Sequence, residues 1–117
     1  MRTLASQWLA GRATLAGLMG GAVGEPGGGW FCQSVDKTNC PPGKLENMIR
    51  QIGNVNQLLA TAGLSPLSHT WIFAQGNIRS VTRPDGWTLV VVTRADAASA
   101  RTLNVLAAEF LALEPAG

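Results

Sequence analysis

Charged residues are scarce in this chain. They make up 14% of its 117 residues, against about 25% in ordinary soluble domains. So few charges cover little of a monomer's surface, and we expect some apolar surface to be buried against a second subunit or a partner. The net charge is only +2, and the arginines form no basic run. Even if Arg79, Arg83 and Arg94 approach one another, nucleic-acid binding would need a denser basic stripe with aromatic side chains beside it, and we expect none.

Residues that carry catalysis or bind metal are equally few. His69 is the one histidine, and the two cysteines, Cys32 and Cys40, lie eight positions apart with no CxxC spacing. General acid–base catalysis needs a positioned histidine or a carboxylate pair, and a zinc site needs several clustered Cys and His ligands. The few carboxylates are scattered along the chain. We therefore expect no enzymatic activity, no cofactor and no metal.

The chain also lacks a long hydrophobic run. No segment approaches the roughly 20 consecutive apolar residues of a membrane span. Residues 1–23 superficially resemble a secretory signal, but Arg12 interrupts their apolar stretch, so we expect a short first helix in a cytoplasmic protein. In the cytoplasm Cys32 and Cys40 would be inert thiols. A secreted domain closed by a Cys32–Cys40 disulfide is the alternative.

A glycine cluster at residues 25–29 is the one feature that suggests a phosphate loop. A Walker loop would continue with Lys and Ser or Thr at a helix start, whereas Trp30 and Phe31 follow here. No predicted strand-to-helix turn carries the GxGxxG fingerprint of dinucleotide-binding domains. We interpret the cluster as the turn of a hairpin, between an apolar, glycine-rich strand within residues 15–23 and an aromatic strand at 30–35.

Hydrophobic periodicity places the remaining elements. A period of 3.6 residues predicts a brief helix at residues 3–9 and a long one over 45–62, which Gly63 ends. A period of 2 then predicts a meander of strands at 67–73, 78–83 and 87–93. Asp96 is expected to cap a last helix, whose apolar face consists of Ala100, Leu103, Ala107, Phe110 and Leu111, with Leu106 and Leu113 beside it. The apolar stripe of the long helix consists of Leu45, Met48, Ile49, Ile52, Val55, Leu58, Leu59 and Ala62.

These elements predict one α+β domain over residues 1–117, with a disordered tail at about 114–117. Their order is helix, hairpin, helix, three-stranded meander, helix, which gives a five-stranded antiparallel sheet with helices packed on it.

This order resembles the roadblock family, the dynein-light-chain-like domains that include bacterial regulators of small GTPases. The most family-like stretches are LMGGAV at residues 18–23, before a glycine turn, and GWTLVVV at residues 86–92, which leads into Asp96. The resemblance implies a roadblock/profilin-like fold and a non-enzymatic homodimer that binds a Ras-like GTPase or scaffolds a multiprotein complex. By that analogy the dimer contact includes the long helix and the third strand, at Asn47, Arg50, Asn54, Gln57, His69, Trp71 and Phe73.

A small-molecule sensor is the rival function. PAS- and GAF-like domains share the broad shape of roadblock domains, and ligand pockets are mostly apolar and aromatic. Tryptophan is also ordinary core or interface material. A sensor would show a ligand-sized cavity beside the four tryptophans, which are Trp8, Trp30, Trp71 and Trp87.

Overall fold

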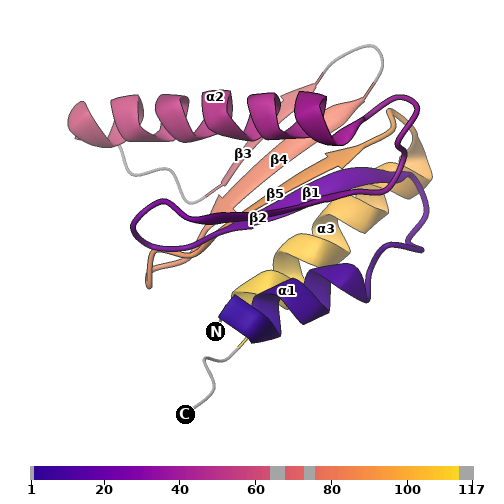
Figure 1. Cartoon of the computed structure of the whole chain (residues 1–117), viewed down its shortest axis with the longest axis horizontal. Coiled ribbons are helices and arrows are strands. Elements are labelled where there is room, and N and C mark those ends of the chain that lie inside the picture. Colours follow the sequence, from indigo (N-terminus) through magenta and orange to yellow (C-terminus); the bar gives the residue numbers. More distant parts are fainter. Residues whose placement is uncertain (1, 64–67, 73–75, 114–117) are drawn as a thin grey trace.

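Three helices cover the two faces of one antiparallel sheet (Figure 1). The structure is a computed structural model, and it describes residues 2–63, 68–72 and 76–113. The expected α+β class is confirmed. In chain order the elements are α1 (Arg2–Ala10), β1 (Leu18–Gly24), β2 (Trp30–Ser34), α2 (Pro42–Thr61), β3 (Ser68–Ile72), β4 (Asn77–Thr82), β5 (Thr88–Thr93) and α3 (Ala97–Ala112).

The strands lie in the order β2-β1-β5-β4-β3, so the last strand of the chain is the central one. Each neighbouring pair is antiparallel. Val90 of β5 pairs with Ala22 of β1 on one side and with Ser80 of β4 on the other. The hairpin and the meander are thus two separate units, and β5 joins them. The two edge strands of the described sheet are β2 and β3.

The central strand β5 is buried on both faces. Leu89 and Val91 point to one side, into a core shared with α1 and α3, whereas Val90 and Val92 point into a second core under α2. Because side chains alternate along a strand, an unbroken apolar run requires a cover on each face. Helix α2 supplies one cover, and α1 and α3 supply the other (Figure 1).

Glycines in β1 let both layers approach the sheet closely. A Cβ at Gly20 would lie 3.2 Å from the sulfur of Cys40, and one at Gly21 would lie 3.2 Å from a methyl group of Leu9 in α1. Glycine weakens an isolated strand but allows this approach. The sequence-based interpretation of residues 15–23 as a strand under a helix is therefore confirmed from Leu18 onward, whereas residues 15–17 belong to the preceding turn.

Asp96 caps α3 as expected. Its Oδ1 accepts a hydrogen bond of 2.7 Å from the backbone N–H of Ser99, and this bond holds the pKa of the Asp96 carboxyl below its usual range. The predicted apolar face of α3 is wrong at two positions, because Ala100 and Leu111 are exposed. The helix is rotated so that small hydroxyl residues meet the turn before β1, and its buried side chains are those of Ser99, Thr102, Leu103, Leu106 and Phe110.

Side-chain hydrogen bonds tie α1 to α3. The Nε1 of Trp8 donates to Oε1 of Glu109 at 3.1 Å, and Nε of Arg12 donates to the same oxygen at 2.7 Å. The Arg12 guanidinium lowers the pKa of the Glu109 carboxyl. The Trp8 and Phe110 rings pack with their centroids 5.9 Å apart. This layer therefore has a fixed geometry as well as an apolar core.

A buried guanidinium fastens the C-terminal end of α3 to the sheet. Arg83 follows β4 and is only 9% exposed. Its Nη1 donates to the carbonyl oxygen of Phe110 at 2.8 Å, its Nη2 lies 3.1 Å from Oδ2 of Asp85, and its Cζ lies 5.6 Å from the centre of the Phe110 ring. Carbonyl groups in the last turn of a helix lack helical partners, so this arginine acts as a cap from outside the helix.

We predict that Arg83→Met lowers the free energy of unfolding by about 2 kcal/mol, because it removes a charge-assisted hydrogen bond and keeps most of the apolar packing. Urea unfolding measures this change. Arg101→Met on the exposed face of α3 is the matched control, with an expected effect within about 0.5 kcal/mol. Equal losses in the two variants would contradict the role assigned to Arg83.

Candidate functional site

Helix α2 is covered along its first half only. Leu45, Ile49 and Ile52 are buried, but Val55 is 44% exposed and Leu58 is 74% exposed. The predicted apolar stripe is therefore wrong at three positions, because Ala62 is exposed as well. A helix of 20 residues is about 30 Å long, which approaches the 33 Å extent of the whole molecule. Its C-terminal end consequently projects past the hairpin (Figure 1).

One polar contact anchors the projecting half of α2. The Nδ2 of Asn56 donates to Oγ of Ser80 on β4 at 3.3 Å. Ser80 is buried, and it faces α2 beside Val90 of β5. The Oδ1 of Asn56 is buried and has no hydrogen-bond partner in the described part of the chain. No local pattern distinguishes Asn56 from the neighbouring amides Asn54 and Gln57, and only its direction in the fold does so.

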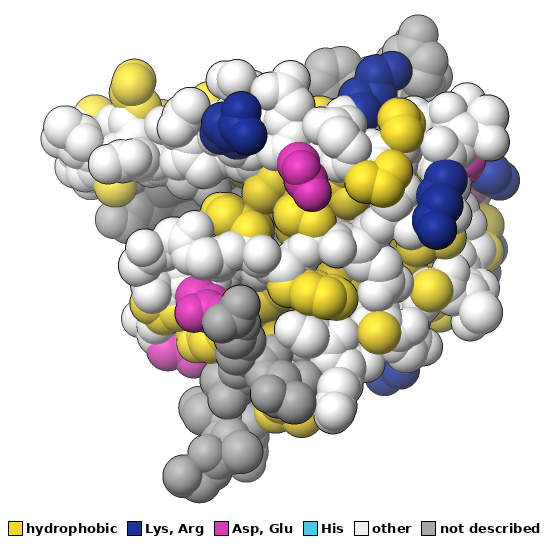
Figure 2. All heavy atoms as spheres, viewed as in Figure 1, with side chains coloured by type: hydrophobic (Ala, Val, Ile, Leu, Met, Phe, Trp, Pro, Cys, Tyr) yellow, Lys and Arg dark blue, Asp and Glu magenta, His cyan; other side chains and the backbone are white. Residues whose placement is uncertain are grey.

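The four α2 residues expected at the dimer contact are all exposed. Three of them, Arg50, Asn54 and Gln57, border a hollow of about 1080 Å³ between α2 and the hairpin, which also includes Trp30 and Thr88. Figure 2 shows hydrophobic side chains gathered in this region, between the helix and the hairpin. Asn47 does not line the hollow. This polar face of α2 is thus turned toward the β2 side of the sheet.

The β3 residues of the same expected contact lie elsewhere. His69 pairs with Ser80 of β4, and Trp71 pairs with Ile78. Strand β3 is the edge opposite to β2, and Ser80, the partner of His69 in the β3–β4 pair, also accepts the hydrogen bond from Asn56 of α2. Phe73 lies outside the described residues. The dimer contact expected at these residues stays a prediction.

The described tryptophans do not share a pocket. Trp8 is buried in the core under α1 and α3, and Trp87 packs against that core. Trp30 packs against the core under α2, on the other face of the sheet. The side chain of Trp71 is outside the described set. The three described rings are therefore divided between the two layers, where each contributes to packing.

The three arginines that were considered for nucleic-acid binding each form hydrogen bonds within the chain. Arg79 donates to Thr70 and to Asn104 of α3, and Arg94 donates to Asp36 at 3.5 Å. Arg83 reaches the end of α3, so the three arginines are held by different partners. Across residues 2–63, 68–72 and 76–113 no three His, Cys, Asp or Glu side chains gather in a way that would hold a metal ion. Nor does this part of the chain contain a helix long and apolar enough to cross a membrane.

Both cysteines carry free thiols. Cys40 is buried against Gly20 of β1, and its backbone oxygen accepts a hydrogen bond from the Ser34 hydroxyl. Burial raises the pKa of the Cys40 thiol and that of the half-buried Cys32 thiol, and the nearby carboxylates of Asp36 and Glu46 add to the respective shifts. Thiols that stay protonated at neutral pH are weak nucleophiles.

Comparison with models of known protein families and with curated protein sequences found no match to this chain.

We predict that both thiols react slowly with Ellman's reagent in the native protein and rapidly in denaturant, with two labels per chain. The raised pKa values mean that the folded state disfavours the thiolate, so stability is highest below the unfolded thiol pKa of about 8.5 and declines as the pH rises through it. Fewer than two labels in denaturant without reductant would indicate the disulfide alternative. Rapid native labelling near pH 7 would contradict the raised pKa values.

Proposed function

We propose that this protein is a non-enzymatic, roadblock-like homodimeric adaptor, which binds a small Ras-like GTPase or scaffolds a multiprotein complex. The support begins with the architecture. The hairpin and the meander flank a central β5, with α2 on one face and α1 and α3 on the other. This arrangement agrees with the element order on which the resemblance to roadblock domains was based. A similar fold is a weak argument for function. The proposal therefore depends on which side chains and strand edges are exposed.

The observation that carries the proposal is the exposed apolar surface at the end of α2. Val55 and Leu58 are two of the four large hydrophobic side chains that are exposed in the described part of the chain. They lie one helical turn apart on the half of α2 that leaves the sheet. A second copy of α2, related by a two-fold axis, would cover the same residues in both subunits, as an isologous interface requires.

Strand β3 supplies the second contact of this proposal. It is the last strand of the described sheet, and its outer edge presents backbone N–H and C=O groups. An unpaired edge invites pairing with another strand. Pairing with the β3 of a second copy would join the two sheets, with His69 and Trp71 beside the junction. The polar α2 residues Asn54 and Gln57 line the same surface as Leu58, so they would lie at this contact too, whereas Arg50 borders the hollow beside the hairpin.

The class of partner comes from the family resemblance. Roadblock domains act as platforms for Ras-like GTPases or as subunits of larger assemblies. The direct test is a pull-down with a Ras-like GTPase encoded beside this protein, loaded with GDP or with a GTP analogue. Retention that depends on the nucleotide supports the adaptor role, whereas no retention together with a monomeric state would overturn it.

We predict a stable dimer by light scattering, near twice the chain mass of 12.3 kDa, and we predict that Leu58→Glu converts it to a monomer. The substitution would bury a carboxylate in an apolar contact, at a cost of several kcal/mol for an unpaired charge. Leu111→Glu is the matched control, because Leu111 is a comparably exposed leucine at 53%. It lies on α3, which covers the other face of the sheet.

Three results separate the possibilities. A dimer lost only in Leu58→Glu supports the α2 contact. A dimer lost only in Leu111→Glu would place the interface on the α1 and α3 layer, against the proposal. If the unsubstituted protein is monomeric at every concentration, the homodimer proposal is wrong.

A further inference from the structure

A second hollow opens at the other end of α2. It has a volume of about 870 Å³, which lies within the range of about 300–1,000 Å³ typical of small-molecule sites. Its apolar lining comes from four elements that are distant in sequence. The residues are Met19 of β1, Met48 of α2, Ile78 of β4 and Val92 of β5, all of which also pack in or against the core under α2.

Two cations line this hollow. Lys44 comes from the first turn of α2, and Arg94 comes directly after β5. They are 50 positions apart in the sequence, and the fold brings them to one cavity. The first turn of α2 contains no acidic residue, and no side chain caps it. Its backbone N–H groups add to the positive potential at this end of the hollow.

The neighbouring carboxylates are already engaged. Asp96 accepts from the Ser99 N–H as the cap of α3. Asp36 accepts from the backbone N–H groups of Thr38 and Asn39 and from the side chain of Asn39 at 3.0 Å. Its contact with Arg94 is long, at 3.5 Å, and the Arg94 side chain remains 61% exposed. Lys44 has no ion-pair partner in the described part of the chain.

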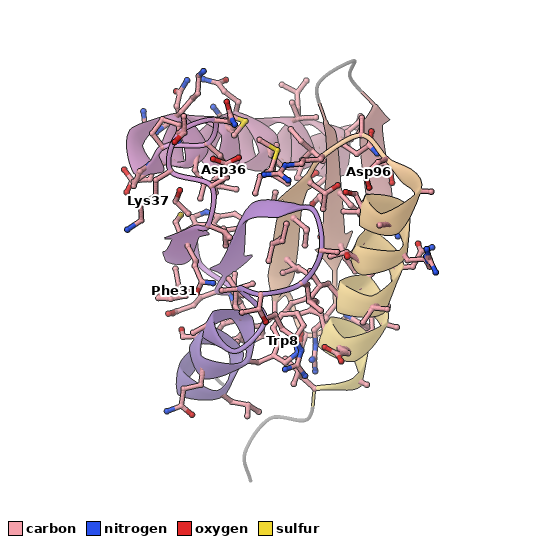
Figure 3. The ribbon with its side chains drawn as sticks, turned by 90° about the vertical axis from the view of Figure 1, so that its right-hand side faces the viewer. Trp8, Phe31, Asp36, Lys37 and Asp96 are labelled. Atoms are coloured by element: carbon pink, nitrogen blue, oxygen red, sulfur yellow. The ribbon has the colours of Figure 1, made fainter. Side chains whose placement is uncertain are left out.

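Figure 3 looks onto this end of the molecule. Asp36 and Asp96 lie on either side of the space below α2, one from the loop after β2 and the other from the start of α3. Lys37, the only other lysine of the chain, points outward beyond Asp36. The buried Cys40 thiol also lines the hollow and, with its raised pKa, adds a neutral surface. The hollow thus combines an apolar floor with a margin that holds Lys44, Arg94 and the Asp96 carboxylate, and Asp96 is engaged as the cap of α3.

We propose that this hollow binds a small organic acid whose apolar body rests on the two methionines and whose anionic head group lies between Lys44 and Arg94. Methionine side chains adapt to apolar groups of varied shape, and a carboxylate or sulfonate accepts charge-assisted hydrogen bonds from lysine and arginine. A neutral ligand of the same shape would leave Lys44 without an anionic partner and would add none to the long Arg94–Asp36 contact. The site uses neither Val55 nor Leu58, so it stands apart from the proposed dimer contact.

The test is a fluorescence titration of the full chain with 8-anilino-1-naphthalenesulfonate, an apolar anion that brightens in apolar surroundings. We expect saturable binding at one site per chain, displaced by decanoate but at least tenfold less effectively by decanol. Lys44→Gln should weaken binding about tenfold, as expected for the loss of one charge-assisted hydrogen bond. Lys37→Gln, which makes the same charge change on an exposed lysine outside the hollow, should leave binding unchanged.

Two further variants test whether the probe binds in this hollow or at the exposed end of α2. Met48→Glu places a carboxylate at the half-buried wall of the hollow and should abolish binding, with circular dichroism showing that the chain remains folded. Leu58→Glu should have no effect, whatever it does to the dimer. Equal weakening by the two lysine variants would show a general charge effect and overturn the site. Binding that only Leu58→Glu removes would place the probe on the exposed end of α2 and overturn it as well.

Discussion

The central strand β5 must be covered on both faces, and the rest of the structure follows from this constraint. Leu89 and Val90 are both fully buried although they point in opposite directions. At roughly 25 cal/mol per Å² of apolar surface, leaving either face open to water would cost several kcal/mol over such a strand. One helical layer cannot meet this requirement. The chain therefore places α2 on one face before the meander begins and returns with α3 on the other after β5 ends.

The two layers differ in how completely they close. The layer of α1 and α3 is fixed by directed contacts, with Glu109 joined to Trp8 and Arg12, and Arg83 bonded to the end of α3. The α2 layer is held mainly by apolar packing along its first half, and among the described residues one side-chain hydrogen bond, from Asn56 to Ser80, joins its second half to the sheet. One hollow remains at the N-terminal end of α2, and another runs along the helix beside the hairpin. Surface available for binding is therefore concentrated on the α2 face.

This division separates the two proposed activities in space. The exposed end of α2 and the β3 edge offer apolar surface and backbone groups to another protein. The hollow at the start of α2 offers an apolar floor with Lys44 and Arg94 to a small anion. The two regions share the helix but no residue. A ligand at one end of α2 and a subunit at the other would both contact the same helix. Because that helix is held on the sheet mainly by apolar packing, each binding event could change its position.

Much of the fold could be predicted from the sequence, because local patterns encode it. The β-branched run in residues 88–93 indicates a central strand, and Asp96 stands where a cap is needed before α3. The glycines within residues 15–23 predict a strand packed closely under a helix, and the structure shows a close approach on both faces of β1. Periodicity shows which face of a helix is apolar, but it does not show how far the sheet extends beneath that face. This is why Val55 and Leu58 were expected to be buried.

The site could not be predicted because it depends on tertiary neighbours. Lys44 and Arg94 belong to different elements, and nothing in either local pattern relates them. In the sequence Arg83 resembles any arginine before a turn. Its role follows from the tertiary structure, in which it donates a hydrogen bond to the carbonyl oxygen of Phe110 at the end of α3. Asn56 and Asn54 are the same residue type two positions apart, yet only Asn56 reaches Ser80. Strand register and tertiary packing determine these contacts, so the amino-acid composition does not predict them.

Hydrogen–deuterium exchange at two protein concentrations, below and above the onset of dimerisation, tests the central claim most directly. If the uncovered half of α2 and the β3 edge are where a second copy binds, residues 55–61 and 68–72 will exchange more slowly in the concentrated sample, and α3 will exchange at the same rate in both. Slower exchange confined to α1 and α3, or no change anywhere while the mass doubles, would contradict the account.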